Sequence, residues 1–229
     1  STGTIVDLAA GLDTLVLGAF VNTVTVTNVE TITGGSTNDT VVYGAAVTGG
    51  TVDLGAGLDT LVFAAAGATV TVSNVETVTG STADDVVTLG GQATGTILDL
   101  DDGDDTLVLG AHVNTVTVSN VETITGGASS DTVTLATQAT GMVVDLAGGA
   151  DTLVLGSHVN TVTVSNVETL TGGSTDDLVT LGAQATGATI DLAAGLDTLT
   201  LGAFVNTVTV SNVETITGGS TNDTVTLGA

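Results

Sequence analysis

The chain has 229 residues, of which 25 are Asp or Glu and none is Lys or Arg, so its formal net charge is -25. This sign excludes nucleic acids and anionic membrane surfaces as partners. The absence of cysteine excludes a disulfide framework and a thiolate metal site, and no apolar run reaches the 18 or so residues that a membrane span needs.

Five copies of a 46-residue repeat make up the chain, at 1–45, 46–91, 92–137, 138–183 and 184–229, without insertion or deletion. Four acidic positions keep the 46-residue spacing: Asp7, Asp53, Asp99, Asp145 and Asp191; Asp13, Asp59, Asp105, Asp151 and Asp197; Glu30, Glu76, Glu122, Glu168 and Glu214; and Asp39, Asp85, Asp131, Asp177 and Asp223. The sequence therefore predicts one uninterrupted repeat domain over residues 1–229.

In chain order, the first copy contains five short runs rich in Val, Ile, Leu and Thr, at residues 4–8, 14–18, 23–28, 29–33 and 40–44. Gly, Asn, Asp and Ala separate these runs, and nothing shows a sustained helical period. β-Branched residues bounded by turn formers indicate strands. Alternation places Val24 and Val26 on one face and Thr23 and Thr25 on the other. The expected fold is all-β.

Stacked copies predict a parallel β-solenoid. "DTLVLGA" from Asp13 returns as "DTVVYGA" from Asp39 and "DTLVFAA" from Asp59, which favours about two coils of about 23 residues per repeat. Ten such coils would span about 48 Å at about 4.8 Å per coil. An alternative count, five strand-turn units per repeat, gives two and a half coils of about 18 residues. The asparagines that follow the third run are expected to form left-handed corners: Asn28, Asn74, Asn120, Asn166 and Asn212.

The turns "GGSTNDTV" (34–41) and "AAGLDTLV" (9–16) resemble the glycine- and aspartate-rich repeats of the RTX, or hemolysin-type calcium-binding, family, with the pattern G-G-x-G-x-D-x-U-x. Gly34 and Gly35 match its first two glycines, but Thr37 stands where the third belongs. Asp39 matches the aspartate. Such diluted turns look like those of surface-layer proteins and giant adhesins. The resemblance implies a parallel β-roll, Ca²⁺ held by turn aspartates and backbone carbonyls, and an extracellular, cell-surface location.

The candidate Ca²⁺ ligands are the turn aspartates, with the densest group around residues 99–105. They are Asp13, Asp39, Asp59, Asp85, Asp99, Asp101, Asp102, Asp104, Asp105, Asp131, Asp151, Asp177, Asp197 and Asp223. Carboxylate and hydroxyl oxygens suit hard cations. In the alternative interpretation each aspartate accepts bonds from the backbone N–H groups of its own turn, without metal.

Three classes of function follow. An enzyme is not expected, because every acid recurs as a ladder and the only bases are two histidines. The recurring Thr-x-Thr at Thr23 and Thr25 would suit an ice-binding face. A structural role explains most: a rod, filament or surface layer stabilised by divalent cations, or the stalk of a giant adhesin.

The expected partners are further copies of the chain, joined end to end or laterally. We expect no nucleic acid, no membrane insertion and no small-molecule substrate. Neither end carries the Lys or Pro that would block strand pairing, so the sequence predicts an uncapped array, cut from a longer one or continued by another copy.

Overall fold

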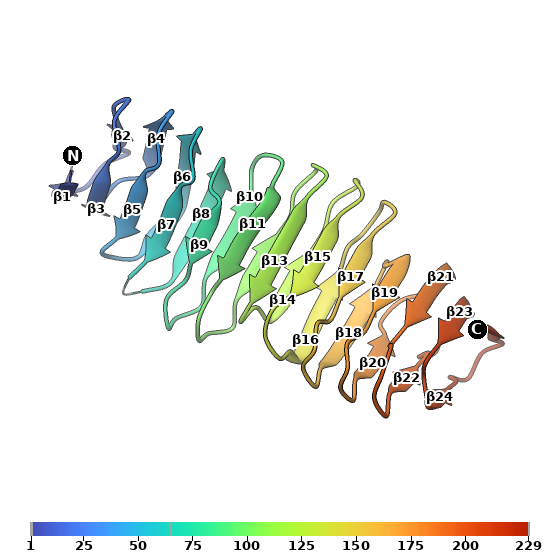
Figure 1. Ribbon diagram of the computed structural model, residues 1–229. Coiled ribbons are helices and arrows are strands. Elements are labelled where there is room, and N and C mark those ends of the chain that lie inside the picture. Colours follow the sequence, from blue (N-terminus) through green and yellow to red (C-terminus); the bar gives the residue numbers. More distant parts are fainter. Residues whose placement is uncertain (1, 65, 229) are drawn as a thin grey trace.

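A computed structural model describes residues 2–64 and 66–228 as an all-parallel β-solenoid (Figure 1). The strands form two parallel sheets of 13 and 12 strands, and the described residues include no helix. The expected fold class is thus confirmed. None of the described segments is a helix long and apolar enough to cross a membrane.

Odd-numbered strands form the 13-stranded sheet and even-numbered strands the 12-stranded sheet. The first holds β1 (Thr2–Asp7), β3 (Thr23–Thr27), β5 (Thr40–Tyr43), β7 (Thr60–Phe63), β9 (Thr77–Thr79), β11 (Thr94–Asp99), β13 (Thr115–Ser119), β15 (Thr132–Leu135), β17 (Thr152–Val154), β19 (Thr169–Thr171), β21 (Thr186–Asp191), β23 (Thr207–Ser211) and β25 (Thr224–Leu227). The second holds β2 (Thr14–Val16), β4 (Thr31–Gly35), β6 (Val47–Gly55), β8 (Ala68–Ser73), β10 (Val86–Leu89), β12 (Thr106–Val108), β14 (Thr123–Thr125), β16 (Thr140–Asp145), β18 (Thr161–Ser165), β20 (Leu178–Leu181), β22 (Thr198–Thr200) and β24 (Thr215–Thr217).

The strand pairing refines the coil count. Consecutive strands alternate between the two sheets, so two strands complete a coil, and each repeat contributes five strands. The repeat therefore spans two and a half coils, the alternative count, rather than two. Equivalent strands of successive repeats lie in opposite sheets: β1 is in the 13-stranded sheet, β6 in the other, and β11 in the first again.

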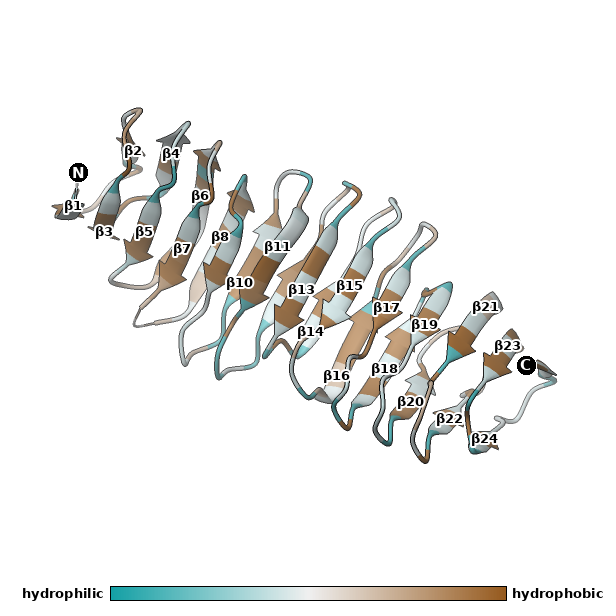
Figure 2. Ribbon diagram, in the orientation of Figure 1, coloured by the Kyte–Doolittle hydropathy of each residue, from teal (hydrophilic) through white to brown (hydrophobic). Residues whose placement is uncertain are grey.

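The core is a stack of aliphatic side chains between the two sheets, contributed by every second residue of each strand. Val116 and Val118 of β13 and Val162 and Val164 of β18 are buried, as the alternation predicts. Figure 2 shows the matching bands of apolar residues across the strands. Burial of these rows on both sides of each coil drives the stacking.

The outward positions carry threonine in register from coil to coil. On the 13-stranded sheet one uninterrupted column runs through seven strands: Thr115, Thr132, Thr152, Thr169, Thr189, Thr209 and Thr226. These side chains are exposed or half-buried, while their strand neighbours Val116 and Val133 point inward. The sheet thus presents a row of hydroxyl and methyl groups at the strand spacing of about 4.8 Å.

Two kinds of residue shape the corners. The predicted asparagine corners are confirmed, because Asn28, Asn74, Asn120, Asn166 and Asn212 all have φ between 51° and 54°. Gly126 is required for another reason: a Cβ there would overlap the backbone carbonyl of Leu146 in the next coil. Each coil is therefore held at backbone contact distance from its neighbour.

Candidate functional site: acid ladders along the two edges

The turn aspartates stack into a column along each edge of the solenoid. At edge 1 the chain passes from the 12-stranded to the 13-stranded sheet, and at edge 2 it passes back. Because the repeat spans a half-integer number of coils, each position of the repeat alternates between the two edges, and three acidic positions of the repeat share each edge. We call the two resulting columns the acid ladders. Edge 1 holds Asn22, Asp39, Asp59, Glu76, Ala93, Asn114, Asp131, Asp151, Glu168, Ala185, Asn206 and Asp223; edge 2 holds Asp13, Glu30, Val47, Ala68, Asp85, Asp105, Glu122, Ala139, Asn160, Asp177, Asp197 and Glu214.

Apart from Asp13 in the first coil, each carboxylate of a ladder accepts a hydrogen bond from the backbone of the preceding coil. At edge 1 the N–H of Asn114 donates to Asp131 Oδ1 at 2.9 Å, and the N–H of Asp131 donates to Asp151 Oδ1 at 2.7 Å. The N–H of Asp151 then donates to Glu168 Oε2 at 2.8 Å. Such charge-assisted bonds are stronger than bonds between neutral groups. The acids therefore link coils that are 17 or 20 residues apart in sequence.

The residues directly before the ladder aspartates form a second column beside each ladder. Side chains of this column accept hydrogen bonds from the backbone of the following coil. The N–H of Asp85 donates forward to Asp105 Oδ1 at 2.7 Å, while the N–H of Asp104 donates back to Asp84 Oδ1 at 3.0 Å. Ser130 takes the place of Asp84 in the next repeat, where its Oγ accepts from the N–H of Ala150 at 2.9 Å. Adjacent turns are thus clamped in both directions.

Eight of the ten ladder aspartates are buried, and most of the ten keep one oxygen without a partner. Within the described residues, Oδ2 has no hydrogen-bond partner in Asp13, Asp39, Asp59, Asp105, Asp131, Asp151, Asp177 and Asp197. In Asp85 this oxygen instead accepts from the N–H of Ser81 in the same turn at 2.8 Å. The interpretation as an own-turn cap therefore describes a bond of Asp85 and a bond of Asp99, whose Oδ1 accepts from the N–H of Asp101 at 3.4 Å, whereas the bonds across coils recur along both ladders.

Burial and stacking of like charges raise the pKa of several ladder acids. Burial is the main cause for Asp59, Asp151, Asp177 and Asp197, and neighbouring carboxylates add to it. For Asp105 these effects raise the pKa to about 7. Two unit charges about 5 Å apart repel by about 3 kcal/mol at an effective dielectric constant of 20. The ladders therefore favour protonation or a counter-ion.

A third acidic column lies at the corners, where its carboxylates are exposed or half-buried. Asp99 Oδ1 accepts from Nδ2 of Asn120 in the following coil at 2.7 Å, and the same pairing joins Asp7 to Asn28 at 2.8 Å. Donation by Asn28 is the main reason why the pKa of Asp7 lies below its ordinary value. Neutral amide donors therefore hold this column.

The structure separates the predicted Ca²⁺ ligands into two groups. Ten of them belong to the ladders: Asp13, Asp39, Asp59, Asp85, Asp105, Asp131, Asp151, Asp177, Asp197 and Asp223. The other four, Asp99, Asp101, Asp102 and Asp104, are exposed at the corner and turn of the third repeat. In residues 2–64 and 66–228 no three acidic or imidazole groups converge as a metal cluster. The carboxylate oxygens that are buried and lack a hydrogen-bond partner are the Oδ2 atoms of the ladder aspartates.

Two sets of ladder members were not expected from the sequence. Glu76, Glu122 and Glu168 each accept a hydrogen bond from a backbone N–H of the preceding coil. Asn114 and Asn160 accept from the N–H of Ala93 and Ala139 and donate through Nδ2 to Asp131 and Asp177. The sequence does show these asparagines recurring at 46-residue spacing. Which ladder residues lie next to them, however, depends on the number of coils per repeat.

Comparison with known proteins finds no family model that matches the chain and no curated protein that is similar to it. The resemblance to RTX repeats therefore rests on the turn residues alone.

Proposed function

We propose that the chain is a structural rod outside the cell, forming part of a filament, a surface layer or the stalk of an adhesin. The observation that carries this proposal is the pair of acid ladders, which join successive coils along both edges except where a Glu is followed by Ala or Val. A fold held together by local, repeating bonds between neighbours can be extended without limit, because each coil contacts only the adjacent ones. No catalytic role is proposed.

Coil stacking is the expected mode of self-association. Leu8 in the first coil and Leu227 in the last described strand are exposed, although Leu100 and Leu135 at the equivalent positions are buried. A further coil, from the same polypeptide or from another copy, would cover such residues and pair the open strand edges.

We further propose that divalent cations, Ca²⁺ foremost, neutralise the ladders. The support is the unpartnered Oδ2 of buried aspartates such as Asp131 and Asp151, in a chain without Lys or Arg. Ca²⁺ prefers oxygen ligands, and backbone carbonyls and water would complete its shell.

Calorimetry on chelator-treated protein tests this neutralisation. CaCl₂ is expected to give saturable heat and a higher Tm than NaCl at equal ionic strength. Asp151→Asn should reduce the heat more than Asp145→Asn, which removes the same charge from a corner whose Oδ1 is paired with Asn166 at 2.7 Å. Heat no different from buffer and an unchanged Tm would remove the calcium proposal and leave the rod.

A second candidate function is binding to ice. The observation in its favour is the seven-strand threonine column on the 13-stranded sheet, a flat array of hydroxyl and methyl groups. Thermal hysteresis at micromolar protein is the test, with Thr152→Asp and Thr169→Asp as interruptions of the column. Clear hysteresis that these variants abolish would replace the structural proposal.

A further inference from the structure

The two acid ladders are interrupted at regular intervals, and a pocket lies at each of three interruptions. The ladder order is Asn, Asp, Asp, Glu and then Ala, so Glu168 of one coil is followed by Ala185 of the next. We call the hollow between such a Glu and Ala an edge pocket. The three are lined by residues of 72–96, 118–142 and 164–190, with volumes of about 140, 220 and 50 Å³.

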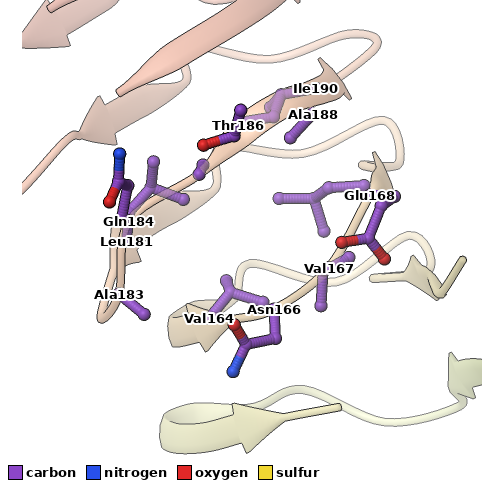
Figure 3. A pocket seen from close by; sticks show the side chains of 12 residues that line it. Val164, Asn166, Val167, Glu168, Leu181, Ala183, Gln184, Thr186, Ala188 and Ile190 are labelled. Carbon is purple, nitrogen blue, oxygen red and sulfur yellow. The ribbon is translucent and has the colours of Figure 1, made fainter. Parts of the chain in front are cut away.

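All three edge pockets carry the same polar groups above an aliphatic floor. In the third pocket Asn166, Glu168, Gln184 and Thr186 surround the hollow (Figure 3), and Val167 belongs to the floor. The equivalent polar residues are Asn74, Glu76, Gln92 and Thr94 in the first pocket and Asn120, Glu122, Gln138 and Thr140 in the second.

These groups fit an ammonium ion on an aliphatic stem. Glu168 is exposed, and only its Oε2 accepts from the backbone, at 2.8 Å from the N–H of Asp151. One carboxylate with amide and hydroxyl oxygens matches the three donors of an ammonium group, and the apolar floor matches its methylene stem. A Ca²⁺ ion is less well served, because it takes six to eight oxygens and each pocket offers one carboxylate.

The arrangement of the pockets indicates a partner with several such groups. The first and third lie on edge 1, between β8 and β10 and between β18 and β20, whereas the second lies on edge 2. The pockets on edge 1 are five coils apart, about 24 Å. Two lysines eight residues apart in an extended strand lie about 26 Å apart on one face, so a single segment can reach both.

We propose that the edge pockets bind lysine side chains of a basic partner protein lying along one edge of the solenoid. The chain itself has no lysine, so the partner is a different protein, and the net charge of -25 attracts it. This inference does not rest on the structural role: a rod without a partner remains a rod, and the pockets can be tested separately.

The test uses two peptides of identical composition in a Gly/Ser background, each acetylated at its N-terminus only. In one peptide the two lysines are eight residues apart, and in the other they are two residues apart. Linking two sites by a tether of suitable length raises affinity through effective concentration. Calorimetry is expected to show at least tenfold tighter binding of the widely spaced peptide. In ¹H–¹⁵N spectra, the side-chain amides of Gln92 and Gln184 should shift together.

Matched variants separate pocket binding from general attraction. Glu76→Gln disables one of the two pockets on edge 1 and keeps an oxygen acceptor for the N–H of Asp59, which donates to Glu76 at 2.7 Å. It should abolish the tenfold advantage of the wide spacing. Glu122→Gln makes the same charge change on edge 2 and should preserve the tenfold advantage of the widely spaced peptide.

Three results would overturn the proposal. Equal weakening by Glu76→Gln and Glu122→Gln would indicate attraction by the overall field alone. Absence of shifts at the glutamine amides would place the peptide elsewhere. Binding of spermidine as tight as that of the widely spaced peptide would identify a free polyamine, instead of a protein, as the ligand.

Discussion

At the scale of single residues, the unusual feature is a buried carboxylate whose neighbours are also carboxylates. Asp105 is fully buried, accepts from the N–H of Asp85 at 2.7 Å, and gives its own N–H to Glu122 at 2.8 Å. Backbone donors stabilise the charge, whereas burial and the neighbouring acids oppose it. At Asp105 these two effects oppose each other, so the pH and the ions in solution decide its charge.

The solenoid should be more stable in mild acid than in mild base. Burial, supported by the charges of Asp85, Glu122 and Asp84, raises the pKa of Asp105 to about 7 from an ordinary value of 3.8. A folded-state pKa above the unfolded value adds stability that is complete below the unfolded pKa and is lost as the pH rises through the folded pKa. Without divalent cations, Tm at pH 5 should exceed Tm at pH 8 by roughly 5 °C or more.

Two variants check the source of that dependence. Asp105→Asn removes the titrating group and should flatten the change in Tm between pH 5 and pH 8. Asp102→Asn removes an exposed acid of the same turn and should leave the change as it is. A Tm that rises with pH in the unmodified chain would contradict the assignment.

The asparagine corner combines a backbone and a side-chain contribution that substitution can separate. Asn120 has φ 52° and donates through Nδ2 to Asp99 at 2.7 Å. Asn120→Ala loses the bond and places an alanine in left-handed backbone, at an expected cost of about 2 kcal/mol in the free energy of unfolding. Asn120→Gly loses only the bond and should cost about 1 kcal/mol. Urea unfolding measures both, and equal losses would show that the backbone contributes nothing.

At the scale of strands and turns, the close contact between coils depends on glycine at one position in each of the first four repeats: Gly34, Gly80, Gly126 and Gly172. Gly126→Ala would drive a methyl group into the Leu146 carbonyl and should destabilise the chain by about 2 kcal/mol or more. Gly148→Ala is the matched control, because the nearest atom to its added Cβ lies at 3.9 Å. It should change Tm little, as Ala56 and Ala194 at the equivalent positions suggest.

The sequence alone predicted the strands and their inner faces, because alternation at Val24 and Val26 needs no long-range information. It also predicted the asparagine corners. The ladder partners were not predictable, since they depend on register. The N–H of Asp131 meets Asp151, 20 residues away, and the N–H of Asp151 meets Glu168, 17 residues away. Only strand pairing shows that a glutamate column and two aspartate columns share an edge.

At the scale of the whole molecule, the half-integer coil count changes the periodicity expected of a filament. Two and a half coils advance by about 12 Å per repeat, and the structure returns to the same edge only after two repeats, about 24 Å. Electron microscopy or fibre diffraction of assembled chains should show this pair of spacings. A spacing of about 9.6 Å, which two coils per repeat would give, would contradict the stacking.

The half-integer count also has a consequence for copy number. One added repeat turns everything beyond it by half a revolution about the long axis, so each later edge pocket moves to the opposite side of the rod. Two added repeats return each later edge pocket to its original side and only lengthen the rod. The parity of the number of copies, and not the number itself, therefore decides which side faces a fixed partner. A lineage whose partner must stay on one side should gain and lose repeats in pairs.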